Sequence, residues 1–164
     1  MRPDDQPTVR TSVLFVCLGN ICRSPLAEGV FRDLVRAEGL EDRFEIESAG
    51  TGAWHVGELP DSRATMVAER YGVTLESRAR QVIDEDLGRF HYIIAMDGEN
   101  LSHLQRMAEA AGSEAHVHLF REFDPEGGGD VPDPYYGGAS GFETVYEMVA
   151  RSARGLLDHI TAGS

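Results

Sequence analysis

The stretch from Val13 to Pro25, VLFVCLGNICRSP, constrains the chain most, because it predicts a strand, a tight loop and a helix in immediate succession. Residues 13–16 form an apolar run with the length and β-branched content of a buried strand. Pro25 suits the first turn of a helix, where its missing N–H is not needed, and apolar residues follow at helical spacing. The loop therefore carries a thiol, Cys17, at one end and a guanidinium, Arg23, at the other.

A loop of this kind predicts an anion-binding site. The N–H groups of its spacer residues can point at one spot, with the helix dipole behind them, which suits an anion of phosphate size. Arg23 can bind two phosphate oxygens at once, and the positive potential favours the thiolate of Cys17 as a nucleophile beneath the phosphoryl group. The alternative is a structural cysteine beside a helix-capping Ser24. The combination of thiol, spacer, guanidinium and hydroxyl favours the catalytic interpretation.

Three stretches together resemble the low-molecular-weight protein tyrosine phosphatase family. Cys17–Pro25 resembles the phosphate-binding loop of that family. Ser48–His55, SAGTGAWH, resembles the segment after its second strand, and Asp133–Gly137, DPYYG, resembles its acid loop. The likeness runs from about Ser12 to Ile160, nearly the whole chain. Several phosphatase folds share the spacing between the cysteine and the arginine. The position of this motif after the first strand, together with Asp-Pro-Tyr-Tyr late in the chain, is specific to this family.

The resemblance implies a protein tyrosine phosphatase that hydrolyses phosphotyrosine and aryl phosphate monoesters. Cys17 would form a phosphocysteine, Arg23 would bind the phosphate, and Asp133 would act as general acid and then as general base. Pro134 biases Asp133 toward an extended conformation. Spacing alone does not separate this aspartate from three other acidic residues of the same loop, but the match to Asp-Pro-Tyr-Tyr does.

Further residues are predicted to bind the substrate or support the loop. Asn20 tolerates a left-handed backbone and can brace the loop, and Ser24 can donate its hydroxyl to Cys17 as well as cap the helix. In the family pattern Ser48 helps to hold the loop. An aromatic slot accepts a phosphotyrosine ring and is too deep for phosphoserine, although Trp54 could instead belong to the core. The predicted substrate-binding residues are Leu18, Gly19, Asn20, Ile21, Cys22, Ser24, Trp54, Tyr135 and Tyr136.

Two positions concern the regulation and the stability of the loop. The resemblance implies that Cys22 can form a reversible disulfide with Cys17 and so protect the nucleophile from overoxidation. The alternative is that Cys22 is only a small buried residue behind the loop. The family often carries a histidine two residues before the Ala-Arg-Gln run, where this chain has Ser77. We therefore expect a different or weaker brace on Asn20, with a water molecule as one candidate bridge.

The net charge of −13 argues against nucleic acid and anionic membranes as partners. It also predicts weak binding of acidic peptides at low salt. No run of about 18 apolar residues and no leader is visible, so we expect no membrane span and a cytoplasmic protein, export without a signal peptide being left open. Two cysteines in one loop and scattered histidines predict no metal and no cofactor. The expected partners are tyrosine-phosphorylated proteins, and a monomer is expected.

Hydrophobic patterning predicts strands alternating with helices. Further strands are expected at 44–48, 92–96 and 116–120, with helices at 61–71 and 99–111, a helical turn at 84–87 and a last helix from Ser140 or Gly141. Pro60 or Asp61 is expected to start the first of these helices, Asp97 can cap the second, and helices are expected to end at Gly39, Gly72 and Gly112. The glycines of residues 48–52 predict a loop. This pattern indicates an α/β fold, a single-domain three-layer sandwich with helices on both faces of a parallel sheet. The resemblance implies four strands in the order 2-1-3-4. Residues 1–11 are expected to be a disordered tail and residues 12–164 a single phosphatase domain.

Two other functions compete with hydrolysis. A thioredoxin-coupled arsenate reductase shares the fold and the loop, but its chemistry needs a relay of further cysteines, and none follows Cys22. A phosphotyrosine-binding module without turnover is the second alternative. The presence of Cys17, Arg23 and Asp133 together favours an active enzyme.

Overall fold

Four parallel strands form one sheet in the order β2-β1-β3-β4, as predicted. The computed structural model describes residues 10–135 and 139–162, without the side chains of residues 139 and 140. The strands are β1 (Thr11–Cys17), β2 (Phe44–Gly50), β3 (Tyr92–Ala95) and β4 (His116–Leu119). The helices are α1 (Arg23–Ala37), α2 (Ser62–Arg70), α3 (Asp86–Arg89), α4 (Gly98–Ala111) and α5 (Ala139–Ala162), with 3-10 turns η2 (Glu41–Arg43) and η3 (Phe120–Phe123).

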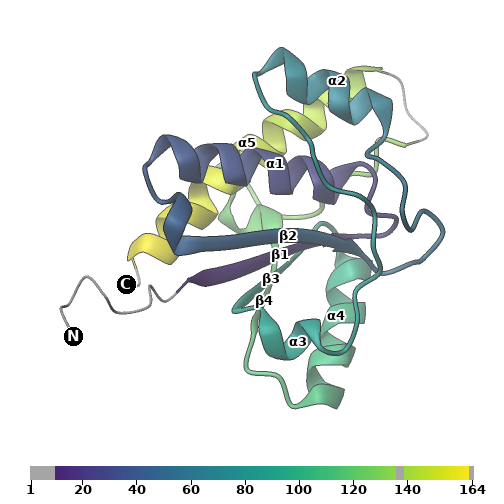
Figure 1. Cartoon of the computed structure of the whole chain (residues 1–164), viewed down its shortest axis with the longest axis vertical. Helices are drawn as coiled ribbons and strands as arrows, with labels where there is room; N and C mark the ends of the chain where they lie inside the picture. The colour runs from purple at the N-terminus through teal and green to yellow at the C-terminus, as the bar shows by residue number, and fades with distance from the viewer. Residues whose placement is uncertain (1–9, 136–138, 163–164) are drawn as a thin grey trace.

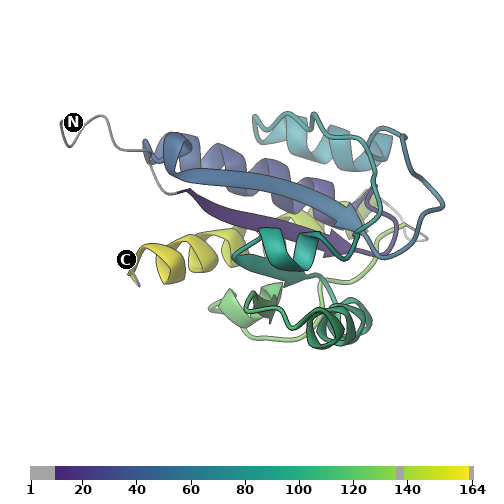
Figure 2. The same cartoon turned by 60° about the horizontal axis from the view of Figure 1, so that its bottom comes forward.

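Alternate residues of β1 face two separate hydrophobic cores. On one face Phe15 meets Phe31 of α1 and Phe120 edge-on, with ring centroids 5.5 and 5.3 Å apart. Helices α1 and α5 cover this face, and α2 lies against both of them (Figure 1). On the other face Leu14 joins a second core with Leu104 of α4 (Figure 2). Helices therefore cover both faces of the sheet, which confirms the predicted three-layer sandwich.

The predicted helix signals are confirmed. The side chains of two aspartates cap helix N-termini, and three glycines in left-handed backbone conformations end helices. These residues are Asp61, Asp97, Gly39, Gly72 and Gly112.

Several element boundaries differ from the prediction. β2 continues to Gly50, where glycines had predicted a loop, because it pairs with β1 as far as the Cys17–Gly50 register. The first helix begins at Arg23, so Pro25 is its third residue and lies in the first turn, as predicted. Helix α3 begins two residues later than the turn expected at 84–87. The sheet thus extends farther toward the predicted loop than local propensity indicates.

Parts of two predictions lie outside the described residues. Of the expected tail, residues 1–9 are outside, and Thr11 is already the first residue of β1. Tyr136 is outside as well. None of the helices in the described ranges combines the length and the apolar character that crossing a bilayer requires.

The order of the strands fixes where a ligand site can form. The chain passes from β1 to β2 on one side and then returns to β3 on the other side of β1. The loop after β1 therefore leaves the sheet at the topological switch point, the position at which parallel sheets bind ligands. The carboxyl ends of β1, β2 and β3 meet at the same edge, at Cys17, Gly50 and Ala95.

Candidate active site

A cavity of about 430 Å³ opens at this edge of the sheet. Most of the residues predicted for catalysis and substrate binding line it, together with one residue that was not predicted, His55. The lining residues are Cys17, Leu18, Gly19, Ile21, Cys22, Arg23, Trp54, His55, Asp133 and Tyr135. Segments that lie far apart in the sequence thus contribute to one pocket.

The loop from β1 to α1 wraps around the sulfur of Cys17. Cys17 is buried, the backbone N–H of Asn20 points at its Sγ atom at 3.3 Å, and the Ser24 hydroxyl lies 3.0 Å from the same sulfur. Asn20 has a φ of 57°, a left-handed conformation that asparagine tolerates. The N–H groups of Gly19 and Ile21 donate to no acceptor among the described residues. They remain available for the oxygens of a bound anion.

Arg23 closes one side of the loop. Its guanidinium is 3% exposed and donates from Nη1 to Asp97 Oδ2 at 2.7 Å and to the carbonyl oxygen of Val131 at 2.9 Å. Burial alone would lower the pKa of Arg23, but Cys17 and the hydrogen bond and charge of Asp97 outweigh it, so its pKa is raised. Arg23 therefore keeps its charge in the buried site.

Asp97 is a site residue that the sequence analysis treated only as a helix cap. Its Oδ1 atom accepts the N–H of Asn100 at the start of α4, while Oδ2 holds Arg23. One carboxylate thus serves the helix and the site together. Its place directly after β3, at the carboxyl edge of the sheet, was the signal that could have identified it.

Asp133 lies at the rim of the cavity. Its side chain is 40% exposed, and its Oδ2 atom is 3.7 Å from Nη2 of Arg23. Its Oδ1 atom accepts the backbone N–H of Tyr135 at 3.0 Å, which fixes the carboxylate within the loop. The carboxyl group therefore faces Arg23 from the open side of the pocket.

Aromatic residues form the mouth of the cavity. Trp54 is 72% exposed, which excludes the core-packing alternative. Its ring lies over Gly52, where a Cβ atom would come within 1.8 Å of it, so only glycine permits this placement. Tyr135 stands opposite, near the ring of His55 at a centroid distance of 6.4 Å, and the guanidinium of Arg63 lies 5.5 Å from its ring. The mouth can therefore contact a flat ring.

The comparisons with known proteins agree with this geometry. A family profile described as "Low molecular weight phosphotyrosine protein phosphatase" matches residues 12–163. The chain belongs to this family. Proteins named low molecular weight phosphotyrosine protein phosphatase from Sus scrofa and Schizosaccharomyces pombe are 42% and 46% identical, over 93% of this chain and 97% and 99% of theirs. A Streptomyces coelicolor protein named low molecular weight protein-tyrosine-phosphatase is 47% identical over 88% of this chain and 90% of its own.

Solved structures show the same fold. YfkJ from Bacillus subtilis superposes with a TM-score of 0.88 at 41% identity, covering 94% of this chain and 97% of its own. A protein tyrosine phosphatase from Entamoeba histolytica, solved with Hepes in its active site, gives a TM-score of 0.87 at 34% identity over 93% of this chain and 98% of its own. The likeness covers the sheet and the cavity together.

The second thiol of this phosphatase, Cys22, lies in a buried and acidic environment. Both cysteines are free. Burial raises the pKa of Cys22, and the neighbouring charges of Asp61 and Cys17 raise it further. Cys22 is therefore a neutral thiol, and the reversible disulfide with Cys17 stays a prediction.

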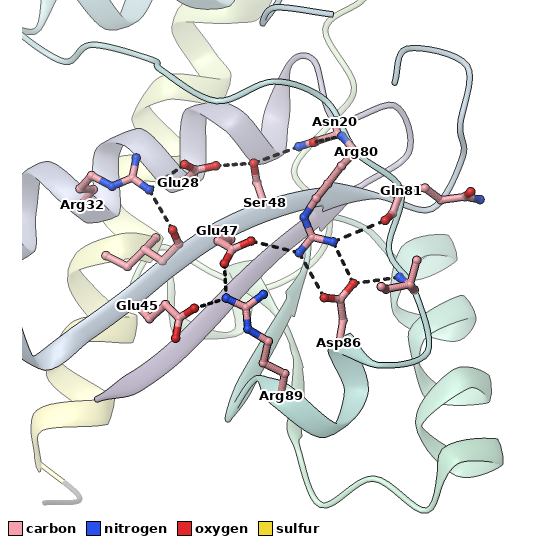
Figure 3. Close-up of polar contacts among 12 residues, drawn as sticks. Asn20, Glu28, Arg32, Glu45, Glu47, Ser48, Arg80, Gln81, Asp86 and Arg89 are labelled. Carbon is pink, nitrogen blue, oxygen red and sulfur yellow. Dashed lines mark hydrogen bonds and ion pairs between the residues drawn. The ribbon is translucent and has the colours of Figure 1, made fainter. Parts of the chain in front are cut away.

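Asn20 of the phosphate-binding loop is held by direct hydrogen bonds, and these do not involve the histidine that the family often carries. Asn20 Oδ1 accepts the backbone N–H of Arg80 at 3.0 Å, and Asn20 Nδ2 donates to the hydroxyl of Ser48 at 3.0 Å (Figure 3). Asn20 Nδ2 also donates to the hydroxyl of Ser24 at 2.7 Å. Ser77 makes no hydrogen bond to Asn20 in the described part of the chain. The brace on Asn20 is different, as predicted, and consists of direct hydrogen bonds with protein groups.

Proposed function

We propose that this low-molecular-weight protein tyrosine phosphatase hydrolyses phosphotyrosine monoesters through a phosphocysteine on Cys17. The observation that carries the proposal is the position of the Cys17 sulfur at the base of a cavity whose wall is the buried, charged Arg23. Arg23 and the loop N–H groups would bind the phosphoryl oxygens. Their catalytic contribution comes from any hydrogen bond that improves as the transition state forms.

Asp133 would move protons in both halves of the reaction. In the first half Cys17 attacks phosphorus, the P–O bond to the tyrosine breaks, and Asp133 gives its proton to the departing phenolate. In the second half the carboxylate takes a proton from the water that attacks the phosphocysteine, which releases inorganic phosphate and the free thiolate. The exposure of Asp133 at the rim allows contact with both the leaving group and water.

The aromatic mouth supports an aryl phosphate as the substrate. Trp54 and Tyr135 would contact the ring of a phosphotyrosine whose phosphate reaches the base of the cavity. Tyrosine-phosphorylated proteins are the partners that this geometry and the family indicate. Monomeric state, cytoplasmic location and redox regulation through Cys22 stay predictions.

A chromogenic aryl phosphate assay on the wild type and on Cys17→Ser tests the proposal. The wild type should turn over and form a phosphoprotein that mass spectrometry after rapid quenching locates on Cys17, and Cys17→Ser should lose both properties. Wild-type turnover by Cys17→Ser would contradict the mechanism. Phosphotyrosine binding without turnover by the wild type would indicate a binding module, and thioredoxin-dependent reduction of arsenate would indicate the reductase.

A further inference from the structure

Glu28 of α1 is a buried carboxylate that the proposed mechanism does not use. It is 5% exposed, and its Oε2 atom pairs with Arg32 Nη2 at 2.7 Å, one helical turn farther along. Its Oε1 atom is in short contact with the hydroxyl of Ser48 on β2. Arg32 also donates to the carbonyl oxygen of Ile46 at 2.8 Å, which fixes the counter-ion against the same strand (Figure 3).

The carboxylate determines the direction of the first two hydrogen bonds in a chain. A carboxylate only accepts, so the single hydroxyl proton of Ser48 is donated to Glu28. The Ser48 oxygen must then accept from Asn20, whose Nδ2 atom lies 3.0 Å away. The backbone N–H of Arg80, which can only donate, requires the Oδ1 atom at the other end of the same carboxamide. Both neighbours therefore demand one orientation of Asn20.

The chain continues to the sulfur. The second Nδ2 proton of Asn20 is donated to the Ser24 hydroxyl oxygen at 2.7 Å. Ser24 keeps its own proton for the Cys17 sulfur at 3.0 Å, a shorter contact than the 3.4 Å to the carbonyl oxygen of Ala49. Every hydrogen bond from Glu28 as far as Ser24 thus has a defined direction, and a Ser24 proton donated to the sulfur stabilises a thiolate.

We propose that Glu28 is a positioning residue for the nucleophile, because its carboxylate orients the chain of hydrogen bonds through Ser48, Asn20 and Ser24 to Cys17. The proposal rests on the role of Cys17 under the proposed function. The direct charge of Glu28 would disfavour a thiolate, and Arg32 offsets that effect. Removing the carboxylate therefore has two opposite effects on the Cys17 thiolate. The loss of the oriented hydrogen bonds destabilises the thiolate, and the loss of the negative charge stabilises it.

The substitution Glu28→Gln separates the two effects. Arg32 can only donate, so it selects the carbonyl oxygen of the new amide and turns the amide N–H₂ toward Ser48. Ser48 then accepts from the glutamine as well as from Asn20, and its own proton no longer has a carboxylate to donate to. Without that charge-assisted bond the Ser48 oxygen is a poorer acceptor for Asn20, and the last hydrogen bond to Cys17 is weakened.

The readout is the rate at which iodoacetamide alkylates Cys17 in the full chain, located by mass spectrometry, because the thiolate is the reactive form. At mildly acidic pH we expect Glu28→Gln to react about fivefold more slowly than the wild type. The double variant Glu28→Gln/Arg32→Met should react faster than Glu28→Gln alone, because the glutamine can then turn its carbonyl oxygen to Ser48. A merely structural role predicts the opposite order.

Asp124→Asn is the matched control. Asp124 is a similarly buried carboxylate, 6% exposed, but it pairs with Arg121 and Arg151, and no hydrogen bond in the described residues joins it to the loop. The rate at which Cys17 is alkylated in Asp124→Asn should stay within about twofold of the wild-type rate, since Asp124 contacts no residue of the hydrogen-bond chain. The control thus removes the loss of a buried charge as an explanation.

If folded Glu28→Gln is alkylated at the wild-type rate or faster, the proposal is wrong; a faster rate is what the loss of charge alone predicts. If Glu28→Gln does not fold, Ser48→Ala breaks the same chain of hydrogen bonds with a smaller change. Cys17 of Ser48→Ala should also be alkylated more slowly than in the wild type, and an unchanged rate would refute the chain of hydrogen bonds. Alkylation needs no turnover, so failure of the hydrogen-bond chain is distinct from failure of the proposed function, which the assay of Cys17→Ser decides.

Discussion

Arg23 is held at three points by groups from two parts of the chain. Asp97 follows β3, Val131 belongs to the long loop before α5, and Asp133 lies two residues beyond it. Such an arginine has little freedom to rotate, so its guanidinium is oriented before the substrate arrives. Preorganisation of this kind lowers the cost of forming the transition state.

Replacing Asp97 with asparagine tests this orientation. Asparagine is as good a helix cap as aspartate, so α4 should remain intact, but the charge-assisted bond to Arg23 is lost. We expect kcat/KM for an aryl phosphate to fall about tenfold, with little change in the thermal midpoint measured by calorimetry. An unchanged kcat/KM would show that Val131 alone orients the guanidinium.

Asp133→Ala should show the signature of a missing general acid. Turnover should fall about 10²–10³-fold for a phenyl phosphate, whose leaving group is poor, and much less for an aryl phosphate whose phenolate leaves without a proton. Rates for a series of substituted phenyl phosphates measure this difference. An equal loss across the series would assign the proton transfer to another group.

At the scale of the elements, Gly155 lets α5 pack closely against η3. A Cβ atom at this position would lie 1.9 Å from the carbonyl oxygen of Phe123, a backbone atom that a side-chain rotation cannot move. Gly88 in α3 is the matched contrast, because no atom lies within 4 Å of the place that a Cβ atom would take there. The two glycines therefore sit in helices for different reasons.

We predict that Gly155→Ala lowers the free energy of unfolding by about 2–3 kcal/mol, because α5 must move away from η3. Gly88→Ala should leave it unchanged or raise it by about 0.5 kcal/mol, since alanine has the higher helix propensity. Urea denaturation of both variants measures the difference. Equal stability of the two variants would contradict the close contact.

Much of this architecture could be predicted from local patterns. The apolar strands, the aspartate caps and the terminating glycines are properties of short segments, and the loop with Cys17 and Arg23 is one of them. Glu28 and Arg32 were not predicted, because a charged pair spaced four residues apart on a helix resembles an ordinary solvent-exposed pair. Only the packing of α1 on β2 buries Glu28 and brings Ser48 against it. Contacts between distant segments therefore determine the remainder of the site.

For the whole molecule, the net charge of −13 opposes the approach of anionic substrates. Arg23 acts within its buried pocket, whereas the surface charges act at long range and are screened by salt. We expect kcat/KM for an acidic phosphopeptide to rise about two- to fivefold between low and physiological ionic strength, while a neutral phosphopeptide changes little. A fall with added salt would instead indicate a local basic site for the peptide.

The exposed Trp54 is the only tryptophan in the chain. Because its indole already faces water at the rim of the cavity, unfolding the protein will alter its fluorescence little. An aryl ligand that covers the indole will shift its emission to shorter wavelength. Titration with an aryl phosphonate therefore reads occupancy of the pocket without a label, whereas the melting of the fold has to be followed by circular dichroism.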